Sequence, residues 1–128
     1  MGSLMNHIVW AACGGAVGSA LRYLVVTFAS KNWPNAVFPY GTLVVNAIGC
    51  FVIAWIGTLA ADKITLNAEI RVFLFTGILG GFTTFSAFGY ETFYLIKTSH
   101  VHLAVLNVLL NCFFGLGAVW LGYMVARI

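Results

Sequence analysis

The sequence predicts an all-α membrane protein with four transmembrane helices, and both its composition and its hydropathy pattern support this fold class. Of the 128 residues, 62% are hydrophobic and only 7% are charged, whereas soluble domains carry about 25% charged residues. Four apolar segments lie at residues 8–30, 38–61, 72–96 and 103–126, and each has the roughly 20 residues that a helix needs to cross a bilayer. Only short polar stretches join them, so we expect residues 1–128 to form a single four-span membrane domain.

The first span contains closely spaced small residues and one arginine. Gly14 and Gly18 form a GxxxG pattern, which allows two helix backbones to approach closely. Packing within the chain is the favoured interpretation, and a contact between subunits is the alternative. Arg22 is costly in hydrocarbon, so it either extends to the membrane interface or lines a water-filled vestibule.

The second and fourth spans carry asparagines. Asn46 lies three residues before Gly49, while Asn107 and Asn111 are four residues apart and therefore share one helix face. Amides in a membrane commonly form hydrogen bonds between helices, but they can also line a narrow polar track. Both interpretations stay open at this point.

The third span contains a run that fits a continuous helix badly. Residues 80–89 read GGFTTFSAFG, and glycine, threonine and serine are weak helix formers. An unwound backbone is tolerated in lipid only where protein buries it or where it lines a wet cavity, and interrupted helices place backbone groups at ion sites. We therefore predict a helix broken in mid-membrane and a role in transport. Glu91 follows this run and is expected to face the protein interior, paired or protonated.

Three side chains after the predicted break share one helix face, namely Phe85, Phe88 and Thr92. A phenylalanine pair at helical spacing usually indicates packing, but its position directly after the break favours a functional role. The edge of a phenyl ring is positively polarised, as are the amide N–H groups of Asn107 and Asn111. Such groups could attract a small anion without the full positive charge that would trap it, and weak sites of this kind suit conduction.

The basic residues do not favour one orientation in the membrane. Three of them lie on the side of the termini and three on the opposite side: Lys63, Arg71 and Arg127 against Arg22, Lys31 and Lys97. Because an excess of Lys and Arg normally marks the cytoplasmic side, this balance is compatible with both orientations. Two oppositely inserted copies could then pair as an antiparallel, dual-topology homodimer. The alternative is that another signal orients the chain.

Several stretches resemble the Fluc (CrcB) family of fluoride channels. The run GGFTTFSAF at residues 80–88 resembles the GGxTTFSTF signature of that family, and GTLVVN at residues 41–46 resembles its GTLxxN motif. The glycine-rich first span with Arg22 and the stretch LNVLLN at residues 106–111 are similar to its first and fourth spans. The resemblance implies a dual-topology homodimer that passively exports fluoride across a bacterial cell (inner or plasma) membrane and protects against fluoride toxicity.

The resemblance also implies roles for individual residues along a fluoride pathway. These residues are Phe85, Phe88, Asn46, Asn107, Asn111, Ser86, Thr92, Arg22 and Glu91. Ala87 replaces the usual threonine of the motif, and Gly115 stands where relatives often carry serine. Which hydroxyl groups assist the ion therefore stays open.

A structural sodium ion is the cofactor that the resemblance implies. The backbone carbonyls of Gly80 and Thr83 match the positions that hold this ion at the centre of the dimer interface. Two carbonyls from each of two copies would give four oxygen ligands, which suit a hard cation.

The competing function is a small dual-topology transporter of organic cations, of the small multidrug resistance type. That function would require a carboxylate in the first span, which contains Arg22 but no Asp or Glu. An enzyme is not expected, because no nucleophile–base set and no zinc-ligand spacing is present. Binding to nucleic acid is not expected either, because the basic residues are scattered rather than clustered.

Overall fold

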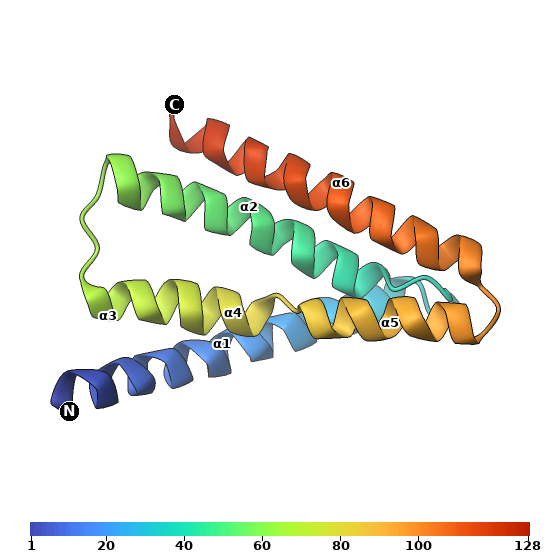
Figure 1. The fold of residues 1–128 in the computed structure, drawn as a ribbon, viewed down its shortest axis with the longest axis horizontal. Helices are drawn as coiled ribbons and strands as arrows, with labels where there is room; N and C mark the ends of the chain where they lie inside the picture. The colour runs from blue at the N-terminus through green and yellow to red at the C-terminus, as the bar shows by residue number, and fades with distance from the viewer.

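The computed structural model describes residues 1–128, and all of its regular structure is helical (Figure 1). Helix α1 spans Gly2–Asn32, α2 spans Tyr40–Asp62 and α6 spans Val101–Ala126. A third long helical segment, Ala68–Lys97, lies between α2 and α6 in the chain. All four segments are long and apolar enough to cross a membrane, which confirms the four-span membrane protein expected from the sequence.

The third segment is built from four consecutive pieces. These are α3 (Ala68–Arg71), the π-helical η1 (Val72–Leu79), α4 (Gly80–Phe82) and α5 (Phe85–Lys97). The side chain of Asn67 accepts a hydrogen bond from the backbone N–H of Ile70 at 2.8 Å and so caps the start of α3. This cap explains why the segment begins before the predicted residue 72. Helix α1 begins at Gly2, six residues before the apolar stretch that starts at residue 8.

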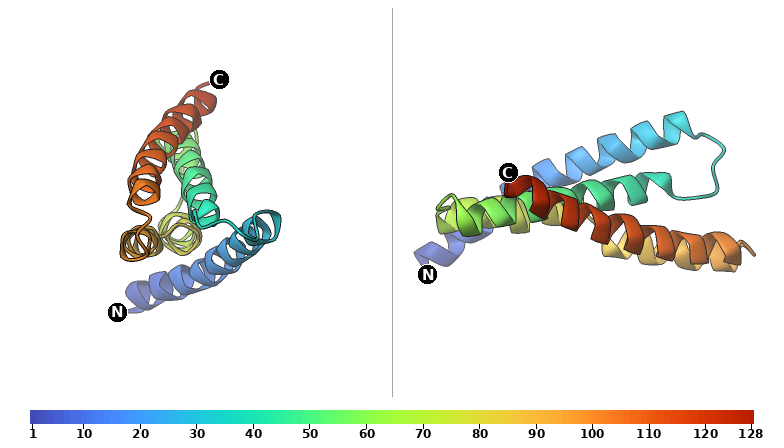
Figure 2. Two further views of the ribbon diagram at one scale, coloured as in Figure 1. Left: turned by 90° about the vertical axis from the view of Figure 1, so that its right-hand side faces the viewer. Right: turned by 90° about the horizontal axis from the view of Figure 1, so that it is seen from above.

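The helices are arranged around the third segment. The most extensive packing joins α2 to α6, and α1 to η1 and α4. In the view along the helices (Figure 2, left), the third segment lies between α1 and the α2–α6 pair. Helix α5 also contacts α6, so the region between α4 and α5 is close to both α2 and α6.

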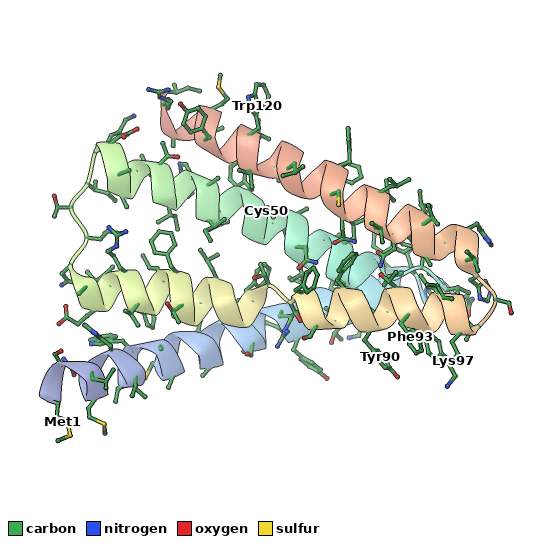
Figure 3. The ribbon with its side chains drawn as sticks, viewed as in Figure 1. Met1, Cys50, Tyr90, Phe93, Lys97 and Trp120 are labelled. Carbon is green, nitrogen blue, oxygen red and sulfur yellow. The ribbon has the colours of Figure 1, made fainter.

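A single copy of the chain has little buried core. Only 16 of its 128 residues are buried, and large apolar side chains point outwards from every long helix. Figure 3 shows Tyr90, Phe93 and Lys97 projecting from α5 on the side away from α6. Helices that are apolar all round require lipid or another protein around them, so this surface fits a multi-pass membrane protein.

Helix α1 packs against the third segment almost backbone to backbone. A Cβ atom added at Gly18 would overlap the carbonyl oxygen of Ile78, and one added at Gly14 would overlap the carbonyl oxygen of Phe73. From the opposite side, a Cβ atom at Gly81 would lie 2.6 Å from the carbonyl oxygen of Gly15. The GxxxG pattern therefore serves packing within the chain, as expected.

We expect Gly14→Ala to destabilise the protein by about 1–3 kcal/mol, the usual cost of overpacking a tight contact. The reason is that the added methyl group would have to displace the backbone of η1. Gly15→Ala is a matched control, because a Cβ atom at that position meets nothing within 4 Å. The thermal unfolding of both purified variants in detergent measures the difference. Equal midpoints would contradict the tight packing of α1 on η1.

Candidate functional site

The third helical segment is interrupted at two threonines (Figure 1). Helix α4 ends at Phe82, Thr83 and Thr84 have extended backbones with ψ angles of 154° and 118°, and α5 begins at Phe85. The hydroxyl of Thr84 accepts a hydrogen bond from the N–H of Ala87 at 3.2 Å, so Thr84 is the N-cap of α5. The helix resumes at Phe85, earlier than the poor helix propensity of residues 80–89 suggested. The depth of this interruption in a membrane stays a prediction.

Asn46 of α2 binds the interrupted backbone directly. Its side-chain oxygen Oδ1 accepts a hydrogen bond from the N–H of Thr84 at 3.3 Å. In an unbroken helix this N–H would reach the carbonyl of Gly80, four residues earlier. One turn after Asn46, a Cβ atom at Gly49 would overlap the methyl group of Thr83. The glycine therefore lets α2 approach the interruption closely enough for the amide to bind it.

A continuous row of hydrogen bonds leads away from the interruption through three asparagines. Asn46 Nδ2 donates to Asn111 Oδ1 at 3.1 Å, and Asn111 Nδ2 donates to Asn107 Oδ1 at 2.9 Å. Asn107 Nδ2 then donates to the hydroxyl of Thr92 at 2.9 Å. Asn107 is completely buried. The structure therefore brings together the amides of α2 and α6 with Thr92 of α5, although they are far apart in the sequence.

The row of amides lies beside a cavity of about 560 Å³. Asn46, Asn111, Phe85 and Phe88 all line this cavity, together with Gly80, Thr83 and Thr84 of the interrupted segment. The rings of Phe85 and Phe88 have centroids 5.5 Å apart and are tilted by 50°. Phe85 is 83% exposed in a single copy. Residues with amide groups, aromatic rings and a free backbone thus line one space.

The hydroxyl of Ser86 does not belong to this row of hydrogen bonds. Its Oγ lies 3.1 Å from the Oγ of Thr84, and the residue is exposed. Thr92, by contrast, accepts the bond from Asn107 and donates its own proton to the carbonyl of Phe88 at 2.7 Å. Of these two hydroxyl groups, only that of Thr92 belongs to the hydrogen-bonded row.

Arg22 and Glu91 line a second cavity of about 400 Å³, which also reaches Thr84. The hydroxyl of Thr42 donates to Glu91 Oε1 at 2.7 Å. The other carboxyl oxygen, Oε2, is buried and has no hydrogen-bond partner. Thr42 is a residue that the sequence analysis missed. Its signal was its position four residues before Asn46, on the same face of α2.

The backbone carbonyls at the interruption have the chemistry of ligands for a hard cation. The N–H of Thr84 binds Asn46 instead of Gly80, and the carbonyl of Thr83 accepts no backbone hydrogen bond. Both residues, Gly80 and Thr83, face the larger cavity. No group of three or more His, Cys, Asp or Glu side chains is placed to hold a metal. The donor set therefore fits an alkali cation better than a transition metal.

An interrupted helix and a row of hydrogen-bonded amides beside a cavity, within four segments able to span a membrane, are typical of a small membrane transport protein. The chain belongs to the CrcB family, because the family model described as "CrcB-like protein, Camphor Resistance (CrcB)" matches residues 9–123.

Proteins from several bacteria are similar to this chain over nearly its whole length. A protein of Helicobacter pylori is 46% identical over 125 residues, which is 96% of this chain and 95% of the relative. A protein of Roseiflexus sp. is 42% identical over 122 residues, which is 95% of this chain and 98% of the relative. Both relatives are named "Fluoride-specific ion channel FluC".

Proposed function

We propose that this multi-pass membrane protein is a passive, fluoride-selective channel that exports fluoride and thereby protects the cell against fluoride toxicity. The names of its relatives support this function. The row of Asn46, Asn111 and Asn107 beside the rings of Phe85 and Phe88 is the structural feature that supports it most directly. The names of the relatives also describe an ion channel and not an enzyme.

The amide row offers hydrogen-bond donors to an anion. Each asparagine carries two N–H donors, and Asn46 uses one of them to bind Asn111. Asn46 Nδ2 donates no other hydrogen bond within the chain, and the residue lines the cavity. Fluoride is a small and strong hydrogen-bond acceptor, so a neutral N–H group binds it without the full charge that would hold it permanently. This weak binding is what conduction requires.

The aromatic rings complete the same environment. Phe85 and Phe88 offer positively polarised ring edges to an anion, and Asn107 with Thr92 extends the polar row beyond the cavity. Arg22 and Glu91 line the neighbouring cavity, where we assign them to the vestibule. Because a passive channel follows gradients, export requires a source of internal fluoride. Neutral HF entering from acid surroundings and dissociating inside supplies it.

A fluoride flux assay tests this function. Purified protein in liposomes loaded with potassium fluoride should release fluoride, measured with a fluoride electrode, far faster than protein-free liposomes do, once the potassium carrier valinomycin lets K⁺ leave with it and balance the charge. Chloride-loaded liposomes should release little, and an organic dye cation should not be taken up. Uptake of the cation without fluoride release would instead support the organic-cation transporter, which the relatives' names do not favour.

We further propose that two copies pair as an antiparallel homodimer in the lipid bilayer. The even distribution of basic residues permits both orientations. In one copy Phe85 is 83% exposed although it lines the cavity, so a single chain does not enclose the pathway. A second copy would supply the missing wall.

Added charge should control this assembly. We expect Ile64→Lys with Thr65→Lys, in the exposed loop between α2 and α3, to lock one orientation and to lower fluoride flux, because a small charge excess then decides insertion. Asn35→Lys adds charge on the opposite side and should lock the other orientation. Co-expression of the two locked forms should restore flux. Full flux from either form alone would exclude an obligatory antiparallel pair.

We also propose a structural Na⁺ ion at the dimer interface, held by the carbonyls of Gly80 and Thr83 from both copies. The hydrogen bond from the N–H of Thr84 to Asn46 supports this assignment. In a continuous helix that N–H would bind the carbonyl of Gly80, which is therefore left without this donor. The positive charge of such an ion would bias the nearby pathway towards anions.

A further inference from the structure

Two of the three cysteines line the cavity beside the phenylalanine rings. Cys50 lies on α2, near its middle (Figure 3), and Cys112 lies on α6. All three cysteines are free. Cys13 lies on α1 and does not line this cavity. The chain therefore places two thiol groups in the space assigned to fluoride and a third thiol elsewhere.

Each cavity thiol is close in the sequence to an asparagine of the hydrogen-bonded row. Cys50 lies four residues after Asn46 and so occupies the same face of α2, while Cys112 directly follows Asn111. A Cβ atom added at Gly115 would meet only the sulfur of Cys50, at 3.5 Å. The small glycine thus leaves room beside this thiol for an added group.

We propose that the cavity lined by Cys50 and Cys112 binds soft, thiol-seeking metal ions such as mercury(II) at its thiol groups, and that this occupation closes the pathway. The closing effect rests on the proposed fluoride function, but the binding does not. Sulfur is the ligand that soft metals prefer, and neither amides nor ring edges compete for them. A metal bound at either thiol would fill the cavity next to Asn46 and the two rings.

The reaction with mercuric chloride is a simple substitution. A sulfur–mercury bond forms while the S–H bond and one Hg–Cl bond break, and the proton and the chloride ion leave into water. No oxidation or reduction is involved. Because HgCl₂ is neutral and enters lipid as well as water, it reaches all three thiols. The position of a thiol, rather than its accessibility, then decides whether its reaction stops flux.

The experiment measures fluoride efflux from liposomes before and after treatment with HgCl₂, together with the intact mass of the recovered chain. The full chain should lose most of its flux, and dithiothreitol should restore it. Cys13→Ser should lose flux to the same extent. Cys50→Ser/Cys112→Ser should retain its own untreated flux after treatment, although its mass shows mercury on Cys13. If the double serine variant does not fold, Cys50→Ala/Cys112→Ala replaces it in the same experiment.

The two readouts separate this site from the proposed function. If untreated protein carries no fluoride, the proposed function fails, while mercury adducts on Cys50 and Cys112 still test the binding. If the untreated channel conducts and mercury blocks the double variant as strongly as the full chain, the proposal is overturned. Protection by Cys13→Ser would also overturn it, because the closing thiol would then lie on α1.

Discussion

Replacing Phe85 or Phe88 with isoleucine is expected to reduce fluoride flux to near background while the protein still folds and assembles. Isoleucine keeps much of the bulk but has no positively polarised ring edge to offer an anion. Phe85 is largely exposed in one copy, so its replacement removes little packing from the chain itself. The loss should therefore appear in flux, measured in liposomes, and not in the elution volume of the purified protein.

Phe93→Ile is the matched control for this prediction. Phe93 lies on the same helix, α5, but projects away from α6 (Figure 3) and does not line the cavity. Its replacement should leave flux unchanged. Normal flux in both Phe85→Ile and Phe88→Ile would remove the rings from the mechanism, whereas equal losses in all three variants would indicate a general effect on α5.

The features that follow from local sequence were predicted well. Hydropathy is a sum over about 20 neighbouring residues, so the four spans could be recognised without knowing how they pack. The close approach at Gly14 and Gly18 was also predictable, because spacing alone places both on one helix face. The shared face of Asn107 and Asn111 has the same origin.

The features that depend on packing were not predictable from the sequence. The bond between Asn46 and the N–H of Thr84 joins residues 38 positions apart, and the bond between Thr42 and Glu91 joins residues 49 positions apart. The π-helical turns of η1 also gave no sequence signal. There the N–H of Gly80 reaches the carbonyl of Phe75, five residues back. Such turns are rare and occur frequently at functional sites; here only the three residues of α4 separate them from the interruption.

Removal of sodium is expected to abolish fluoride flux, and its return is expected to restore it. The carbonyls at Gly80 and Thr83 lack helical donors, and an unsatisfied carbonyl in a membrane costs several kcal/mol. Sodium suits these neutral oxygens better than a divalent ion, because no carboxylate lies within residues 80–89 to balance a double charge. Protein purified in a buffer of N-methyl-D-glucamine, without sodium, should conduct only after sodium is added. Labelled sodium should not cross the membrane with fluoride.

Substitutions at the interruption separate the role of the backbone from that of the side chains. Thr83→Ser should be mild, because it keeps the carbonyl and also the hydroxyl that donates to Leu79 at 2.9 Å. Proline at Gly81 or Phe82 should abolish flux, since it restricts both its own φ angle and the residue before it. Unchanged flux in the absence of sodium would exclude the ion. In that case the unwound backbone would be stabilised by the amide of Asn46, which already binds the N–H of Thr84, together with the hydroxyl groups of Thr83 and Thr84.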